Sequence, residues 1–157
     1  DYPGCPEDLI FFHHHLSTGG QLFRVNNKLV TYRYHENSAS LKIHRLTLLK
    51  QRIKFLEQQV LEAWERFSIW SSGRDGKKFL MLLSPKHQAK VNQFVDINEK
   101  KINTIYVNIK TNQKIPIDPI EKLQPPFIVC VALDRYKEKL IDHIESVEKS
   151  LGKPLVQ

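Results

Sequence analysis

The chain has 157 residues, which is enough for one ordinary domain or two small ones. Its apolar content of 41% suffices for a core, and its formal net charge of +7 favours an anionic partner, nucleic acid before a membrane surface. No stretch approaches the ~20 apolar residues of a membrane span, and Cys5 and Cys130 lie too far apart for a zinc motif or a disulfide framework.

The first predicted element is a helix that begins with two adjacent acids. Apolar residues recur at helical spacing after Glu7 and Asp8, and they predict a helix from Glu7 to about Ser17, ended by Gly19 and Gly20. Acids in a first turn suit the positive end of the helix dipole, so the pair has a structural explanation. The alternative is that a carboxylate at the edge of a cleft serves as a general base.

A hairpin is predicted next. Gln21–Val25 and Lys28–Tyr34 are rich in β-branched and aromatic residues, and Asn26-Asn27 suits a two-residue turn. Alternation along the second strand puts Arg33 and His35 on one face. Such a pair suits a diphosphate or a metal-bound phosphate, or it is an ordinary surface edge.

A long amphipathic helix is predicted over residues 41–66, with one continuous apolar stripe at 3,4 spacing. Its bases lie in the first half and its acids in the second, the reverse of what the helix dipole prefers. A phosphate-bearing partner would explain the order, and a solvated charged face is the alternative. The bases are Lys42, Arg45, Lys50, Arg52 and Lys54, and the acids are Glu57, Glu62 and Glu65.

The pattern then changes to that of a dinucleotide-binding fold. A short apolar strand, Phe67–Trp70, is followed by the small-residue elbow Ser71–Gly76, a helix over Lys77–Leu83 and a strand over Val91–Val95. Asp96 ends that strand about 20 residues after the elbow, where an acid that binds ribose is expected.

The glycine pattern of this elbow is incomplete. Ser71 replaces the first glycine of G-x-G-x-x-G, and Arg74, Asp75 and Lys77 add charged side chains around the turn. The sequence therefore favours a Rossmann-like scaffold without a redox cofactor.

The remainder of the chain continues this alternation. Lys100–Gln113 is predicted to be irregular, and Ile115–Ile117 to be a short edge strand followed by a helical turn. Phe127–Leu133 reads as a strand buried on both faces. A closing helix is predicted over Tyr136–Leu151, with a last strand over Lys153–Val156.

Two sets of motifs carry a family resemblance. Pro6-Glu7-Asp8-Leu9-Ile10-Phe11, then a Gly-Gly pair, the hairpin and Tyr32-Arg33-Tyr34-His35, resemble the C-terminal part of family 2 glycosyltransferases, which have the GT-A fold. Over nearly the whole chain, further motifs are similar to one subfamily that galactosylates queuosine in tRNA. They are Phe67-Ser68-Ile69-Trp70-x-x-Gly73-x-x-Gly76, Phe94-Val95-Asp96-x-Asn98 and Pro125-Pro126-Phe127-Ile128-Val129-Cys130-Val131.

The resemblance implies an α/β fold in three parts. Residues 1–40 would be the C-terminal part of a GT-A domain (helix plus hairpin), residues 41–66 a linking helix, and residues 67–157 a small Rossmann-like accessory domain. It also implies a cytoplasmic, inverting enzyme that moves galactose from UDP-galactose to queuosine in a tRNA anticodon loop.

The resemblance also implies roles for single residues. Asp8 would be the catalytic base, and Glu7 would position the acceptor or hold Asp8. Arg33 and His35 would lie near the donor diphosphate or its divalent metal, Mn or Mg, with His35 as a candidate ligand. The basic composition agrees with a tRNA partner.

The family's nucleotide-binding half and its Asp-x-Asp metal motif lie upstream, and this sequence contains no Asp-x-Asp. We therefore expect a piece of a longer protein that by itself holds neither UDP-sugar nor metal and is inactive. Two alternatives remain open: a nucleotide-binding module with its ligand at Gly73–Gly76, or a tRNA-binding module. The bases that would grip tRNA are Lys50, Arg52, Lys54, Lys77 and Lys78.

Overall fold

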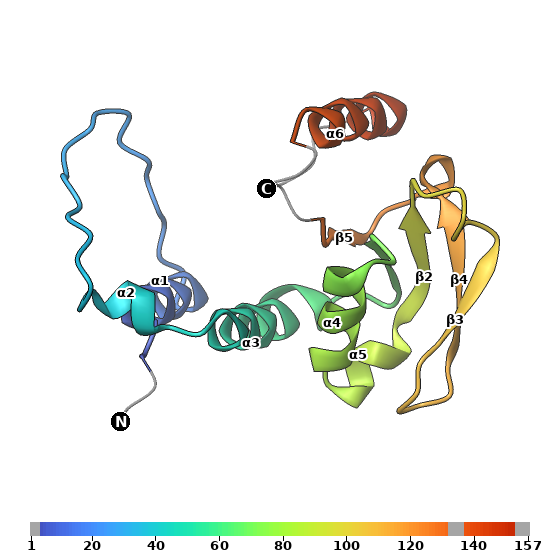
Figure 1. The fold of residues 1–157 in the computed structure, drawn as a ribbon, viewed down its shortest axis with the longest axis horizontal. Coiled ribbons are helices and arrows are strands. Elements are labelled where there is room, and N and C mark those ends of the chain that lie inside the picture. Colours follow the sequence, from blue (N-terminus) through green and yellow to red (C-terminus); the bar gives the residue numbers. More distant parts are fainter. Residues whose placement is uncertain (1–3, 132–136, 153–157) are drawn as a thin grey trace. The chain divides into compact units, whose positions relative to one another are not determined.

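The computed structural model describes residues 4–131 and 137–152, and it divides the chain into two compact units, Asp1–Glu62 and Ala63–Gln157. The first unit is helical, and the second contains a five-stranded mixed sheet with helices (Figure 1). The expected α/β class is confirmed. The boundary between the units falls after Glu62, inside the stretch predicted to be one long helix.

Helix α1 runs from Glu7 to Ser17, as predicted. Pro6 occupies the N-cap position with its ring fully buried, and the backbone N–H of Ile10 donates to the Pro6 carbonyl oxygen at 3.0 Å. At the other end the chain leaves the helix through Gly19, whose φ of +86° suits glycine. The helix therefore begins with both acids in its first turn.

The predicted hairpin is wrong. All of residues 20–35 lie in the described part of the chain, and none of them is in a strand; they form the long loop between α1 and α2 (Figure 1). A two-stranded hairpin is marginal unless one face is covered. Here Phe23 is 84% exposed and Val30 is 83% exposed, so neither packs against anything that would stabilise a ladder.

The predicted long helix is divided into pieces. Helix α2 (Ala39–Lys42) is separated from α3 (Arg45–Leu56) by extended backbone, and the π-helical turn η1 (Glu57–Leu61) follows α3 directly. The break arises because His44 is the N-cap of α3. Its Nδ1 accepts a hydrogen bond from the Leu46 N–H at 3.1 Å, which fixes a new helix start inside the stretch predicted to be one helix.

The sheet of the second unit has the strand order β3-β4-β2-β1-β5. Neighbouring strands are parallel except β3 and β4, which are antiparallel. The chain goes from β1 to β2 on one side and later returns to place β5 on the other side of β1. The strands are β1 (Phe67–Trp70), β2 (Val91–Asp96), β3 (Thr104–Val107), β4 (Lys114–Pro119) and β5 (Phe127–Val129).

The sequence predicted β1 and β2 correctly, but it misplaced the edges of the sheet. The stretch predicted to be irregular contains β3, and β3 takes the edge that had been assigned to β4. β3 leaves Ile105 62% exposed and Val107 42% exposed, because this part of the sheet is uncovered on one face. β5 is a short edge strand with partly exposed side chains, not a strand buried on both faces.

Helices and turns cover the sheet. Helix α4 (Arg74–Leu82) begins three residues earlier than predicted and is followed by α5 (Pro85–Ala89). The 3-10 turn η2 (Ile120–Lys122) and helix α6 (Lys137–Leu151) complete the unit. The predicted strand over residues 153–156 lies outside the described residues.

A core cluster joins the sheet to α6. Trp70 on β1 and Val95 on β2 pack with Leu123 and with Val147 of α6, and each of these side chains is less than a tenth exposed. On the opposite face of β2, Phe94 is fully buried and its ring meets that of Tyr106 edge to face at 5.5 Å. Both sides of the central strands are therefore packed.

Gly76 on α4 has no room for a side chain. An added Cβ would overlap the carbonyl oxygen of Ser71, whereas at Gly73 the nearest atom to an added Cβ is the Ser71 hydroxyl oxygen at 3.2 Å. We expect Gly76→Ala to lower the free energy of unfolding by about 1–3 kcal/mol, because the backbone must shift. Urea denaturation measures this, and Gly73→Ala is the matched control. Equal stabilities for the two variants would contradict the close approach.

Candidate functional site

The two acids expected to act in catalysis lie on the surface at the start of α1. Glu7 and Asp8 are exposed, and one carboxylate oxygen of Asp8 accepts a hydrogen bond from the Leu9 N–H at 2.7 Å. The preceding turn is held in place, because Pro6 is buried and Gly4 packs against Ile43. The second carboxylate oxygen of Asp8 therefore faces solvent from a fixed helix start.

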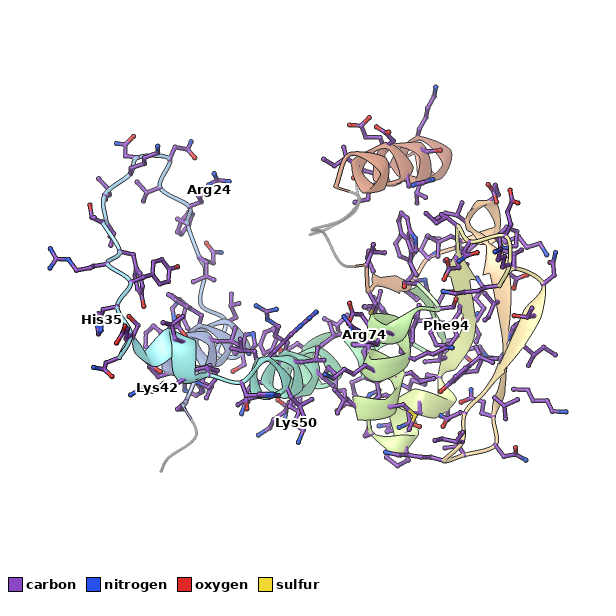
Figure 2. The ribbon with its side chains drawn as sticks, viewed as in Figure 1. Arg24, His35, Lys42, Lys50, Arg74 and Phe94 are labelled. Carbon is purple, nitrogen blue, oxygen red and sulfur yellow. The ribbon has the colours of Figure 1, made fainter. Side chains whose placement is uncertain are left out.

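Arg33 and His35 lie on the loop that follows α1, and both are exposed. The His35 N–H donates to the Ser38 hydroxyl at 2.9 Å, and the Ser38 N–H donates to the His35 carbonyl at 2.8 Å. These bonds make a compact turn before α2, with His35 at its start (Figure 2). In the described residues, no hydrogen bond or ion pair joins Glu7 or Asp8 to Arg33 or His35, so the structure does not assemble the four into one cluster.

Helices α1 and α3 pack through a histidine. The imidazole of His13 stacks on the ring of Phe55 with centroids 4.1 Å apart and planes 11° apart. Burial, and then the positive charge of Arg52, lower the pKa of His13 below its ordinary value. Lys54 lines the small groove beside this stack, whose volume is about 200 Å³. Two of the three bases proposed on α3 therefore lie close to His13.

The two bases proposed on α4 differ in their surroundings. Lys78 is exposed, whereas Lys77 is partly buried and its Nζ lies 5.1 Å from the centre of the Tyr106 ring. A cation over an aromatic face is stabilised there. Lys77 thus has a structural role in the second unit, and Lys78 is the freer of the two for a partner.

The elbow after β1, Ser71–Gly76, is a tight turn that leads directly into α4. Ser71 has a φ of +104°, Gly73 is the N-cap of α4, and Gly76 packs directly on Ser71. Asp75 stands in the first turn of α4, with its carboxylate 3.8 Å from Nε of Arg74. Burial, and then the charge of Asp75, raise the pKa of the Cys130 thiol to about 12. Asp75 therefore puts an acidic side chain in the first turn of α4, the end at which a helix would bind a phosphate.

Asp96 holds this elbow in place. Its Oδ2 accepts from both the backbone N–H (2.9 Å) and the hydroxyl of Ser72, and it lies 3.5 Å from Nζ of Lys101. Its Oδ1 accepts from the Asn98 N–H at 3.0 Å. Burial acts to raise the pKa of Asp96, but the Ser72 hydroxyl, the two N–H groups and Lys101 together lower it below its ordinary value.

The carboxylate oxygens of Asp96, the predicted ribose-binding acid, are therefore already hydrogen-bonded within the protein. Asp96 is 8% exposed, and both of its oxygens have protein donors. The sequence indicated the position of Asp96 but not its partner Ser72. The sequence does contain a signal for this pair: Ser72 is the second residue of the elbow, and Asp96 ends the strand predicted to lie beside β1.

The described residues form no cluster that could serve as a metal centre. Over residues 4–131 and 137–152, no group of three or more His, Cys, Asp or Glu side chains could hold a metal ion, and His35 has no such neighbours. Within the same residues, no helix is long and apolar enough to cross a membrane.

No family model matches the chain, and no solved structure is significantly similar to it.

Removing the charge of Asp96 tests its structural role. We expect Asp96→Asn to lower the free energy of unfolding at pH 7 by about 1.5–3 kcal/mol, the usual value of hydrogen bonds to a charged group. The pKa of Asp96 is lowered in the folded state, so its stabilisation is complete above the unfolded value of about 3.9. It is lost as pH falls through the folded value.

The measurement is denaturation of both proteins from pH 7 down to pH 2. The gap in stability between the wild type and Asp96→Asn should close at acidic pH. A gap independent of pH would show that the carboxylate charge is not what stabilises the elbow.

Proposed function

We propose that this chain is part of a UDP-galactose-dependent inverting glycosyltransferase that galactosylates queuosine in tRNA. The observation that carries the proposal is the Glu7–Asp8 pair, set in the first turn of α1 with a solvent-facing carboxylate on Asp8. The motifs along the chain that resemble this subfamily support a catalytic role for the pair. The proposed setting is cytoplasmic.

In this proposal Asp8 is the general base. Its free carboxylate oxygen takes the proton from an acceptor hydroxyl as that oxygen bonds to the anomeric carbon of galactose. The bond from that carbon to the diphosphate breaks on the opposite face, so the configuration inverts and UDP leaves. Glu7, one residue earlier, positions the acceptor or holds Asp8.

A divalent metal, Mn or Mg, would neutralise the charge of the leaving diphosphate. Arg33 and His35 are proposed to lie near that diphosphate, and their exposure on the loop leaves them available. The metal's main ligands are expected upstream, so we propose that this chain alone is inactive. In support, the first unit exposes several large apolar side chains that a larger domain would cover, Phe11 (64%), Phe23 (84%) and Val30 (83%) among them.

The base assignment is tested in the full-length transferase that the proposal implies. Asp8→Asn keeps the size and polarity of the side chain but removes the base, so sugar transfer should fall by about 10²–10⁴-fold or more. Binding of tRNA, measured by filter retention, should change less than twofold. Glu36→Gln, an exposed acid in the following turn, is the control. Full turnover by Asp8→Asn would reject the assignment.

The tRNA partner is proposed to contact the basic side chains of α3 and α4. Lys50, Arg52, Lys54 and Lys78 are exposed, and Lys77, which lies over Tyr106, is expected to contribute less than Lys78. Each phosphate contact made by such a base releases counterions, which makes the affinity depend on salt.

Reversing the charge of Lys50, Arg52 and Lys54 to Glu should weaken tRNA binding and flatten the plot of log affinity against log salt concentration. The slope should fall by about 0.7–0.9 for each phosphate contact that is lost. Changing Lys100, Lys110 and Lys114, three exposed bases of the second unit, to Glu controls for net charge. An unchanged slope in the α3 variant would place the RNA elsewhere.

A second candidate function is a nucleotide-binding Rossmann-like module in the second unit. It is favoured by the parallel order β4-β2-β1-β5, because ligands of such sheets bind where the chain switches sides, here at the ends of β1 and β5. The chemistry of the elbow argues against a dinucleotide there, since Asp75 is anionic and Asp96 is already bonded to Ser72. We therefore rank this function second.

A further inference from the structure

A polar pocket opens at the opposite end of the sheet from the elbow, where β1, β2 and β5 begin. Its volume is about 540 Å³, inside the 300–1,000 Å³ range usual for ligand sites. The grooves beside α1 and beside α6 are smaller, at about 200 and 250 Å³. None of the residues to which the transferase proposal gives a role lines this pocket.

A β-bulge shapes the pocket. Phe67 pairs with Val91, but Ser68 pairs with Gln93, so Asn92 is an extra residue on β2. Bulges redirect side chains and are common beside binding sites. Because of this one, two consecutive side chains, those of Asn92 and Gln93, both reach the hydroxyl of Ser68, at 3.2 and 3.0 Å.

The direction of each hydrogen bond follows from the Lys122 carbonyl, which can only accept. Nε2 of Gln93 donates to that carbonyl at 3.4 Å and also to the Ser68 hydroxyl oxygen. Ser68, which is 2% exposed, must then give its own proton to Oδ1 of Asn92. This leaves the Nδ2 donors of Asn92 and the Oε1 acceptor of Gln93 outside these hydrogen bonds, on two consecutive residues that line the pocket.

An adjacent donor and acceptor match the edge of a nucleobase, which is read by asparagine and glutamine in this way. Charged groups complete the match. Arg66 provides an exposed guanidinium for a phosphate, while Lys122 is partly neutralised by Asp118 at 3.1 Å. The carboxylate of Glu121 at the rim suits ribose hydroxyls.

We propose that this pocket binds one ribonucleotide, with the base edge on Asn92 and Gln93 and the phosphate near Arg66. The inference goes beyond the transferase proposal and does not depend on it, because every residue involved lies in the second unit. The nucleotide could be a free mononucleotide or an unpaired nucleotide of an RNA strand, and the experiment separates these two sources.

The test titrates the full 157-residue chain with AMP, GMP, CMP and UMP while backbone amide signals are followed by NMR. At least one should bind saturably with a Kd of about 1 mM or tighter, and shift the signals of Ser68, Asn92 and Gln93. No saturable binding of any of the four would overturn the proposal. So would signal changes confined to Ser71–Gly76, which would place the nucleotide at the elbow.

Asn92→Asp is the informative variant, because it keeps an acceptor for the Ser68 hydroxyl while it replaces the outward donor with a negatively charged acceptor. It should weaken nucleotide binding by about tenfold. Asn112→Asp makes the same change in the exposed turn between β3 and β4 and should leave binding unaltered. Equal affinity of wild type and Asn92→Asp would overturn the base contact.

Two further ligands complete the experiment. Ribose 5-phosphate lacks the base, so it should bind at least about tenfold more weakly than the best nucleotide; equal binding would reduce the site to an anion contact and overturn the proposal. Single-stranded trinucleotides separate the sources. Tighter binding than the mononucleotide, with the same sensitivity to Asn92→Asp, identifies an RNA strand, and weaker binding identifies the free nucleotide.

Discussion

The second unit depends on one carboxylate. Asp96 ends β2 and accepts two hydrogen bonds from Ser72, which stands in the turn between β1 and α4. This contact joins two neighbouring parallel strands at their carboxyl ends and fixes where α4 starts. β1 has β2 on one side and β5 on the other, so the turn that Asp96 holds follows a central strand of the sheet.

The two units differ in how deeply their apolar side chains are buried. In the second unit, Phe67, Ile69, Phe94 and Val95 are at most 1% exposed, and their strands form a packed sheet. In the first unit, α1 contains no buried residue, and the long loop after it leaves its aromatic and aliphatic side chains in solvent. A segment of high strand propensity can fail to form strands when the surface that would cover it lies in another part of the protein. This contrast fits the proposal that the first unit belongs to a larger catalytic domain.

The parts of the fold that could be predicted are those specified by residues close together in the sequence. Helix α1, strands β1 and β2 and the elbow between them were readable, because spacing, glycines and a strand-ending acid lie within a few residues of each other. The split at His44 was not, since a histidine that caps a helix cannot be told by sequence from a histidine within one. The hairpin failed because strand propensity becomes a strand only with a partner. For the site, Asp96 could be located but its bonds to Ser72 could not, and the bulge at Asn92 leaves no mark in the sequence pattern.

The exposed edge strand β3 affects how the protein behaves in concentrated solution. Its outward side chains Ile105 and Val107 form a short apolar row beside unpaired backbone groups, the kind of edge through which sheets of different molecules join. Lys110 and Lys114 stand close by and keep like molecules apart by repulsion. That repulsion is screened over about 8 Å at physiological ionic strength and about 3 Å at 1 M salt, so we expect high salt to favour association through this edge.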